Sequence, residues 1–360
     1  MVLLEHLKSG STVSFLKTKL ISDEEFRQKT CVDLSKKDHD YYYGSYSSFY
    51  IHEEMLKDTV RTRAYQRAIE ENPDDFKDKI VLDIGCGTGI LSIFAARAGA
   101  KHVYAIENAE IALFAVEIIK RNNLQDKITV IKGKMEEIKL PVPKVDIIIS
   151  EWMGYFLLYE SMLDSVLWAR DKYLVPGGKM LPDRAIMYVA GIEDGMFKNE
   201  KRAFWDDVYG VNMSCLTPTV MREPLIDEVN SNMLMTHPCK ILELNLCTMK
   251  LSDMEFSSEY KIKSNFEDKI HGLTVWWDCD FSELKRPVRL STSPLEKLTH
   301  WKQTSFYLEH DLNVDVGDEI SGSIASRKSH TNFRELDIKI SCHINSNKIK
   351  KDFYSLYKIR

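Results

Sequence analysis

Residues 80–92 read Ile80-Val81-Leu82-Asp83-Ile84-Gly85-Cys86-Gly87-Thr88-Gly89-Ile90-Leu91-Ser92, and this stretch decides the fold. Its first five residues are a short, mostly apolar and β-branched run without alternation, which is typical of a parallel strand buried on both faces. Three alternate glycines then indicate a tight turn, and apolar residues resume after them as the start of a helix. Because glycine has no side chain, a ligand can lie directly against such a turn. The stretch therefore predicts a strand, a ligand-binding turn and a helix.

The kind of ligand follows from two acids near this turn. Dinucleotide-binding turns read G-x-G-x-x-G and hold a pyrophosphate, whereas this one reads G-x-G-x-G after a strand that carries Asp83. The Asp83 carboxylate would repel a pyrophosphate but could hold water or an ammonium group. A second apolar run, residues 103–107, ends on Glu107, where such folds bind ribose hydroxyls. We expect S-adenosylmethionine rather than a nicotinamide cofactor; the alternative is an ordinary strand-to-helix loop.

Composition sets the class of protein. The 360 residues are 44% hydrophobic and 29% charged with a net charge of -5, which favours a two-domain soluble protein and a basic partner over a nucleic-acid binder. The seven cysteines are scattered without a C-x-x-C pair, so neither a disulfide framework nor a metal site is indicated, and a reducing compartment fits best. No apolar run approaches the ~18 residues of a membrane span. We expect an intracellular protein.

The chain divides into three parts. Residues 1–37 show no sustained period and are expected to be a tail, whereas residues 38–183 alternate strands with helices, which predicts a doubly wound, Rossmann-like parallel sheet of the α/β class. The expected strands are Ile80–Ile84, Val103–Ile106, Ile128–Lys132 and Val145–Ser150, and the expected helices are Ile51–Glu71, Ile90–Ala98, Ala109–Asn122 and Glu160–Tyr173. Residues 174–183 are rich in Pro and Gly and are expected to end this cofactor-binding domain.

Residues 184–360 have a different pattern. Short strand-like segments separated by turn signals predict a mainly β, barrel-like substrate domain. Residues 196–222 interrupt it with a helical and unusually aromatic segment, which is either ordinary core or an arm that forms an interface.

Three features between residues 38 and 140 have two interpretations each. The aromatic run 39–50 is either a staple over the core or a flap that closes over the cofactor. Arg61, on the expected helix, is either a solvated charge or ion-pair partner, or the cation for a cofactor carboxylate. Glu136, after the third strand, either accepts from an adenine amino group or is a surface carboxylate.

A pair of glutamates brackets an apolar loop after the fourth strand. Glu151 and Glu160 enclose the almost wholly apolar residues 152–159, and buried carboxylates are costly unless each meets a cation or donor. A guanidinium, with five N–H donors in a plane, can be held by two carboxylates at once. The alternative is that Glu160 merely starts the next helix. His300, in the later sequence Thr299-His300-Trp301, would alone be interpreted as a structural histidine.

Four motifs together carry a family resemblance. They are residues 42–46 (Tyr-Tyr-Gly-Ser-Tyr), 81–89, 150–155 (Ser-Glu-Trp-Met-Gly-Tyr) with Glu160, and 299–301. Over residues 38–360 the chain closely resembles the protein arginine N-methyltransferases, specifically the type I branch.

The resemblance implies roles for individual residues. Those expected to surround S-adenosylmethionine are His52, Met55, Arg61, Asp83, Gly85, Gly87, Glu107 and Glu136, with Arg61 on its carboxylate and Glu107 on its ribose. Glu151 and Glu160 match the two glutamates that hold the substrate arginine, His300 the loop histidine that pairs with Asp58, and Tyr46 the flap tyrosine. Trp301, with Met153 and Tyr155, is expected to shape the arginine pocket.

The resemblance also implies product and partners. Met55 and the sequence 299–301 favour asymmetric dimethylarginine as product, although family members commonly have Phe where this chain has Tyr43, whose hydroxyl bears on the ratio of mono- to dimethylated product. Expected partners are Arg/Gly-rich RNA-binding proteins and histone tails. A homodimer is also expected, in which residues 196–222 dock on the cofactor domain of a second copy.

Three other functions stay open on sequence alone. A small-molecule or nucleic-acid methyltransferase could use the same sheet, but would lack the glutamate pair and the loop histidine. A non-catalytic scaffold could bind Arg-rich tails, but Glu151, Glu160 and Arg61 are all present. A nicotinamide dehydrogenase is disfavoured by the glycine spacing.

Overall fold

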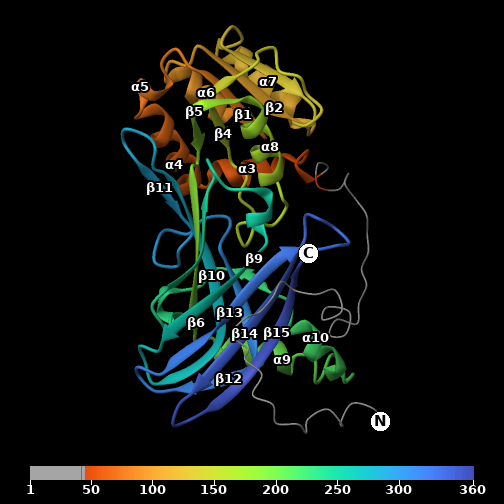
Figure 1. Ribbon diagram of the computed structural model, residues 1–360. Coiled ribbons are helices and arrows are strands. Elements are labelled where there is room, and N and C mark those ends of the chain that lie inside the picture. Colours follow the sequence, from red (N-terminus) through yellow and green to blue (C-terminus); the bar gives the residue numbers. More distant parts are fainter. Residues whose placement is uncertain (1–41, 43–44) are drawn as a thin grey trace.

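The computed structural model describes Tyr42 and residues 45–360. The expected tail, residues 1–37, lies outside this part, as do residues 38–41, Tyr43 and Gly44. Figure 1 shows a parallel sheet with its helices at one end of the molecule and antiparallel sheets at the other. Within the described residues no helix is long and apolar enough to cross a membrane, and no three His, Cys, Asp or Glu side chains are grouped as metal ligands.

The first part is the predicted doubly wound sheet. Its five parallel strands follow the order β3-β2-β1-β4-β5, namely β1 (Ile80–Ile84), β2 (His102–Glu107), β3 (Ile128–Lys132), β4 (Val145–Ser150) and β5 (Leu174–Leu181). The connecting helices are α6 (Ile90–Arg97), α7 (Ile111–Arg121) and α8 (Leu163–Tyr173). The central strand β1 is almost wholly buried, as its unbroken apolar run predicted.

The strand β5 differs from the sequence prediction, which treated residues 174–183 as the end of the domain. Pro and Gly are tolerated here because β5 is an edge strand with one neighbour. At Gly178 a side chain would in fact be excluded, since a Cβ there would lie 2.8 Å from the carbonyl oxygen of Asp146. The glycine is therefore required for close approach of the two strands.

The expected single helix over residues 51–71 is two helices. They are α3 (Phe49–Lys57) and α4 (Thr59–Glu70), followed by the short α5 (Pro73–Phe76). The break falls at Asp58, where the backbone is extended. The Asp58 carboxylate caps α4 by accepting from the backbone N–H of Arg61 at 2.9 Å. An acid at this position favours the start of a new helix. The break was missed because the apolar period continues across it.

The second part is mainly β, as predicted, but its strands form two antiparallel sheets rather than a closed barrel. One sheet has the order β7-β12-β10-β6-β8, with β11 paired to β10, and comprises β6 (Arg184–Ile192), β7 (Leu225–Asp227), β8 (Cys239–Asn245), β10 (Asp268–Phe281), β11 (Val288–Ser291) and β12 (Gln303–Val314). The other has the order β15-β14-β13-β9, with β9 (Phe256–Lys263), β13 (Glu319–Lys328), β14 (Leu336–Asn345) and β15 (Lys350–Ile359). Short 3₁₀ turns lie at Ser231–Met233 and Leu251–Met254.

Residues 196–222 form an excursion with exposed apolar side chains. It contains α9 (Gly195–Ala203), the 3₁₀ turn Ser214–Leu216 and α10 (Thr217–Val220). Five large apolar or aromatic side chains in it are exposed: Met196, Phe204, Tyr209, Val211 and Leu216. The segment is attached through Lys198, whose buried ammonium donates to the carbonyl of Leu308 at 2.7 Å. Of the two interpretations given by the sequence, this exposure favours an interface over ordinary core.

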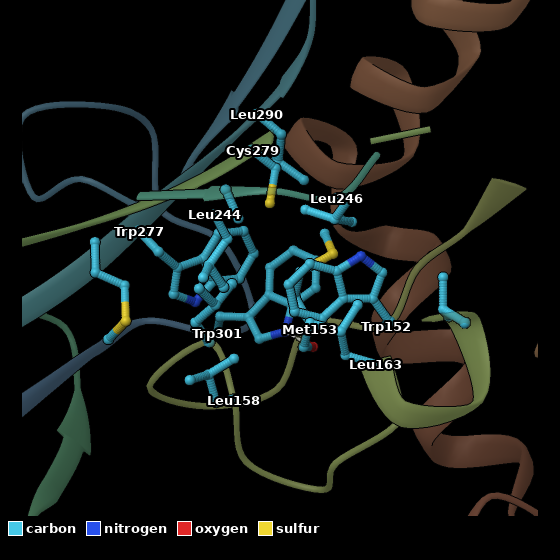
Figure 2. Packing of buried hydrophobic residues seen from close by; sticks show 14 of the residues in the cluster. Trp152, Met153, Leu158, Leu163, Leu244, Leu246, Trp277, Cys279, Leu290 and Trp301 are labelled. Atoms are coloured by element: carbon cyan, nitrogen blue, oxygen red, sulfur yellow. Dashed lines mark hydrogen bonds between the residues drawn. The ribbon is translucent and has the colours of Figure 1, made fainter. Parts of the chain in front are cut away.

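The two parts share one core and are joined by only Pro182 and Asp183. In Figure 2 Trp152, Met153 and Leu163 lie in one cluster with Leu244, Trp277 and Trp301 of the second part. Asp183 is buried, and its carboxylate accepts from Ser282, while its own N–H donates to the carbonyl of Asp280 at 3.0 Å. The core and this join fix the position of the pocket between the parts.

Candidate active site

One pocket, at the carboxyl ends of β1, β2 and β4, gathers the predicted site residues. All of those named from the sequence line it except Asp58 and Asp83, which lie behind its wall. Ligands of doubly wound sheets bind at this edge because the loops there spread apart. The roles of the individual residues remain predictions, but their placement in one site is a finding.

The glycine turn forms one wall of the pocket. Gly85, Gly87 and Gly89 have φ angles of 71°, 54° and 85°, in the left-handed region where other residues are strained. A Cβ on Gly87 would lie 3.3 Å from the ring of His52, so the bare backbone also leaves room for α3. Glu107 is oriented by backbone N–H groups of Gly87 (2.9 Å) and Ala109 (2.8 Å).

Asp83 stands behind this turn without exposure to solvent. The Ser92 hydroxyl donates to its Oδ2 at 2.6 Å, while its Oδ1 has no hydrogen-bond partner within the described chain. Burial raises the pKa of Asp83 to about 7. A buried carboxylate oxygen without a donor suits a water or the ammonium group of a ligand.

Arg61 and Glu151 form a buried ion pair at the centre of the pocket. Arg61 Nε donates to Glu151 Oε2 at 2.8 Å, and Arg61 Nη1 donates to the carbonyl of Met55 at 3.2 Å. Both side chains are 8% exposed. Arg61 is therefore an ion-pair partner inside the site rather than a solvated charge, and its role toward a cofactor carboxylate stays a prediction.

Glu160 is the second carboxylate and is held differently. It does not start α8, which begins at Leu163; it lies in the preceding turn with φ of 75°, next to Ser161 at 56°. The Tyr46 hydroxyl donates to Glu160 Oε2 at 2.7 Å. Burial first, and then the charge of Glu151, raise the pKa of Glu160 to about 7, against the lowering effect of the Tyr46 hydrogen bond. Non-glycine residues in such conformations cost about 1–3 kcal/mol each and need support from their surroundings.

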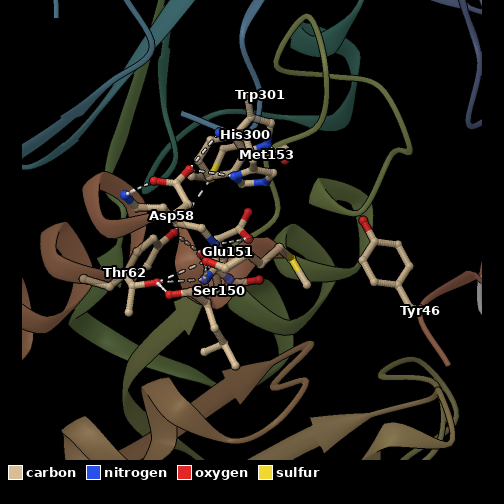
Figure 3. A network of polar contacts seen from close by, with 12 residues as sticks. Tyr46, Asp58, Thr62, Ser150, Glu151, Met153, His300 and Trp301 are labelled. Carbon is tan, nitrogen blue, oxygen red and sulfur yellow. Dashed lines mark hydrogen bonds and ion pairs between the residues drawn. The ribbon is translucent and has the colours of Figure 1, made fainter. Parts of the chain in front are cut away.

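His300 and Asp58 form the predicted pair. His300 Nδ1 lies 2.8 Å from Asp58 Oδ2, and the backbone N–H of His300 donates to the same oxygen at 2.9 Å. Although burial opposes it, the hydrogen bonds from His300 and Arg61 lower the pKa of Asp58. In the view of Figure 3, Asp58, His300 and Trp301 lie on one side of Glu151 and Tyr46 on the other. Asp58 is thus a positioning residue that holds His300 and the start of α4 together.

Three further predicted residues complete the walls. The Trp301 indole donates to the carbonyl of Met153 at 2.8 Å and so fixes the loop after Glu151. Tyr155 lines the mouth of the pocket, with its pKa raised by burial and by Glu54 and Glu160. Glu136 is exposed yet lines the pocket and accepts from the Ser165 hydroxyl, so the site pocket includes it under either interpretation.

Sequence reasoning missed several lining residues, above all Arg334, Tyr42, Glu54, Met162 and Ser165. Arg334 lies in the β13–β14 loop, far along the chain from every motif, and no local pattern marks it. Glu54 lies next to Met55 on α3 and could have been found from helical spacing, whereas Tyr42 stood in the motif 42–46 without an assigned role. Met162 and Ser165 follow Glu160 by two and five residues, at the start of α8.

The donor set fits S-adenosylmethionine. The glycine backbone leaves room for an adenosine, and two N–H groups hold the Glu107 carboxylate at the pocket wall, where it can accept from a ribose. Asp83 does not line the pocket, but its Oδ1 is an unpaired acceptor directly behind the turn. Arg61 uses Nε and Nη1 within the protein and presents its guanidinium to the same pocket. Acids for ribose and ammonium and a cation for the carboxylate are therefore all present.

Comparison with known proteins agrees with this geometry. Residues 183–347 match the family model described as an arginine methyltransferase oligomerization subdomain, and residues 62–164 match that of ribosomal protein L11 methyltransferase. Protein arginine N-methyltransferase 1 of Schizosaccharomyces pombe is 55% identical over 85% of this chain and 90% of its own length. The Saccharomyces cerevisiae protein of the same name is 50% identical over 86% of this chain and 89% of its own.

Solved structures agree as well. A Trypanosoma brucei PRMT1 enzyme-prozyme heterotetramer with AdoHcy superimposes with a TM-score of 0.86 at 41% identity, over 88% of this chain and 100% of that one. Arabidopsis thaliana protein arginine methyltransferase 10 gives a TM-score of 0.81 at 35% identity, over 89% and 100%. With its glutamate pair, loop histidine and glycine turn in one pocket, the chain belongs to the family of protein arginine N-methyltransferases, S-adenosylmethionine-dependent enzymes that methylate arginine.

Proposed function

We propose that this chain methylates arginine in Arg/Gly-rich proteins, including RNA-binding proteins and histone tails, and that its end product is asymmetric dimethylarginine. The observation that carries the proposal is the pair of carboxylates, Glu151 and Glu160, inside one pocket with the cofactor turn. Arg61 and Tyr46 each donate to the Oε2 atom of one glutamate, so each carboxylate keeps its other oxygen for a guanidinium that enters from outside.

The two glutamates hold and polarise the guanidinium. Its nitrogen is a poor nucleophile because the lone pairs are delocalised and the group stays protonated. Carboxylates bonded to two of its nitrogens draw positive charge toward those atoms and leave the third richer in electrons. S-adenosylmethionine, when bound, supplies the electrophilic methyl group. Arg61 keeps Glu151 in place, and Tyr46 does the same for Glu160.

The methylated nitrogen must then lose a proton. Glu160, with its pKa raised to about 7 by burial, is matched to accept one near neutral pH. The His300 and Asp58 pair offers a second acceptor at the same wall, because Asp58 orients the ring. Both groups line or support the pocket, so either can take the proton without rearrangement of the fold.

A basic substrate is supported by charge at the pocket mouth. The chain has a net charge of -5, and the exposed Glu54 on α3 adds a carboxylate beside Glu160 and Tyr155. Negative potential around a cleft raises the local concentration of cationic segments. Arg-rich, Gly-rich tails combine positive charge with the flexibility needed to enter the pocket.

The proposed assembly is a homodimer or larger oligomer. Residues 183–347 match an oligomerization subdomain, and the apolar side chains of α9, α10 and the intervening turn are exposed. A second exposed apolar surface, Leu113, Phe114 and Val116 on α7, is its proposed counterpart on another copy. Replacing Tyr209, which is fully exposed, with Ser should lower the apparent mass in sedimentation, whereas an unchanged mass would exclude this arm as the interface.

Location in the nucleus and cytoplasm is part of the same proposal, since these compartments hold the proposed substrates. The six cysteines of the described residues form no disulfide. Imaging of the tagged chain would decide it.

The deciding experiment is methylation of an Arg-Gly repeat peptide with S-adenosylmethionine, followed by tandem mass spectrometry. Asymmetric dimethylarginine supports the proposal and shows that Tyr43 is tolerated. Monomethylated or symmetric product would keep the chemistry and overturn the product type. Cofactor binding without methylation would favour a scaffold that binds Arg-rich tails.

A further inference from the structure

The loop between β13 and β14, residues 329–335, reaches from the four-stranded sheet into the catalytic pocket. Its residue Arg334 lines the pocket although it is 9% exposed and 174 residues from Glu160. The roles given above to Glu151, Glu160 and His300 do not explain why a buried arginine lies at this position. Among the described residues, Arg334 contacts both the glutamate loop and the flap.

The β13–β14 loop is hydrogen-bonded to Glu160 and Ser161. The N–H of Glu160 donates to the carbonyl of Arg334 at 2.8 Å, and Arg334 Nη1 donates to the carbonyl of Glu160 at 2.6 Å. The Ser161 hydroxyl donates to the carbonyl of Phe333 at 2.6 Å. These bonds hold the two residues whose φ angles, 75° and 56°, are otherwise unfavourable. The β13–β14 loop therefore fixes the direction in which Glu160 projects.

Arg334 also contacts the flap. The Arg334 guanidinium lies 3.7 Å from the centre of the Tyr42 ring, at stacking distance. Tyr42 in turn packs against Tyr46 with ring centres 5.0 Å apart, and the Tyr46 hydroxyl donates to Glu160. Arg334, Tyr42, Tyr46 and Glu160 thus form a closed ring of contacts around the arginine side of the pocket.

We propose that Arg334 is a positioning residue for methyl transfer, which orients Glu160 through its backbone and latches the flap through Tyr42. The inference rests on the proposed function, because it assigns Glu160 to the substrate guanidinium. It predicts that flap closure and the orientation of Glu160 are coupled, so that one side chain influences both cofactor release and turnover.

The groups that face Glu160 give a second readout. They include Tyr46 on the flap, Glu151 after β4, Tyr155 and Tyr159 in the loop between the glutamates, His300 on its loop and Arg334. Among them Arg334 acts to lower the pKa of Glu160 and Glu151 to raise it, while burial raises it most. Loss of the Arg334 charge should therefore move the acidic limb of the kcat/KM profile to higher pH.

Three variants test the proposal: Arg334→Gln, Arg334→Lys and the control Lys328→Gln. Lys328 is at the end of the same hairpin and pairs with Asp164, outside the pocket. The measurements are kcat and KM for an Arg-Gly peptide, the pH profile, the dissociation rate of S-adenosylhomocysteine and the thermal midpoint. The dissociation rate reports on the flap without methyl transfer.

Arg334→Gln should lower kcat by about 100-fold, since a misplaced catalytic group costs about that much, with a smaller change in KM. S-adenosylhomocysteine should leave about 5- to 30-fold faster, the value of a buried cation–ring contact. Arg334→Lys should restore the position of the acidic limb but only part of kcat, because lysine keeps the charge without the planar fork. Lys328→Gln should stay within about twofold of the unmodified chain in kcat, because its partly exposed ion pair with Asp164 lies outside the pocket.

Unchanged kcat, pH profile and dissociation rate in Arg334→Gln would overturn the inference. So would equal losses in Arg334→Gln and Lys328→Gln that follow their thermal midpoints, since that result would indicate a merely structural role. If the unmodified chain binds S-adenosylhomocysteine but methylates no peptide, the proposed function fails, and a normal dissociation rate in Arg334→Gln then rejects the latch as well.

Discussion

The two halves of the pocket are built in different ways. The cofactor half takes Gly85, Gly87, Glu107 and Glu136 from successive loops of one parallel sheet. The arginine half takes Tyr46, Glu151, Glu160, His300 and Arg334 from the flap, two ends of one loop and two loops of the second part. The first half is shaped by local backbone geometry, and the second by contacts between distant segments. Changes should therefore separate into those that affect cofactor binding and those that affect turnover.

The largest separation is expected for the glutamates. Glu160→Gln and Glu151→Gln should each lower kcat by about 10²–10³-fold, because each removes a charge that polarises the guanidinium in the transition state. Glu160→Gln should leave the affinity for S-adenosylhomocysteine within a few-fold, as measured by calorimetry. Glu137→Gln, next to Glu136 but outside the pocket, is the control. Near-normal turnover in either pocket variant would refute the proposal that the two glutamates hold the substrate guanidinium.

Alanine variants of two glycines can distinguish the effect of displacing the glutamate loop from the general effect of replacing a glycine. A Cβ on Gly154 would lie 2.2 Å from the carbonyl oxygen of Tyr159, inside the glutamate loop, where the Gly154 N–H donates to the carbonyl of Leu157 at 2.9 Å. Gly154→Ala should therefore lower kcat by about 100-fold through displacement of the loop, with cofactor affinity little changed.

Gly177→Ala is the matched control for that variant. Gly177 has φ of 74°, and no atom lies within 4 Å of the position that a Cβ would take there, so alanine meets only the left-handed backbone cost. That cost is about 1–2 kcal/mol. Chemical denaturation should detect it without loss of turnover. Similar activity in both alanine variants would show that the glutamate loop adapts freely.

Arg61 is where the halves meet, so its replacement should affect both. Arg61→Gln should weaken S-adenosylhomocysteine by about 10- to 100-fold, the value of a hydrogen bond to a charged group. It should also destabilise the chain by about 3–5 kcal/mol, because Glu151 is left buried without its cation. The double variant Arg61→Gln/Glu151→Gln should recover part of that stability in denaturation experiments. Additive losses would mean that the ion pair does not couple the halves.

The smallest effect is the pH dependence of stability. The pKa of Glu160 rises from an ordinary value of 4.5 to about 7 in the fold, so between these pH values the folded chain keeps a proton that the unfolded chain has released. The contribution to stability is therefore full below pH 4.5 and is lost as pH rises to about 7. In the ligand-free protein, Glu160→Gln should reduce the change in the free energy of unfolding between pH 4.5 and about 7 by up to about 3 kcal/mol. An identical slope in the variant would mean that Glu160 stays ionised.

The same difference between the halves governs what sequence could predict. The strands of the parallel sheet, the glycine turn and Glu107 follow from periodicity and residue type, because contiguous residues fix their own geometry. The role of Asp58 came only from the family resemblance, whereas Glu160 was also found from the sequence as one of two glutamates that bracket an apolar loop. The break between α3 and α4 was missed because a cap overrode the apolar period. Arg334 could not be found, since its role arises from a backbone contact with a residue in the other part of the fold.

The short connection between β5 and β6 limits how substrate can enter the pocket and how product can leave it. Only Pro182 and Asp183 separate the strands, and Asp183 is bonded to the ends of two strands of the antiparallel sheet. Its N–H donates to Asp280 and its carboxylate accepts from Ser282, both at the end of β10, and its carbonyl accepts from Leu246, directly after β8. A rotation of one part against the other would break these bonds and open the shared core. Substrate admission and product departure should therefore proceed through the segment from Tyr46 to Lys57, leaving the body of the enzyme as a rigid frame.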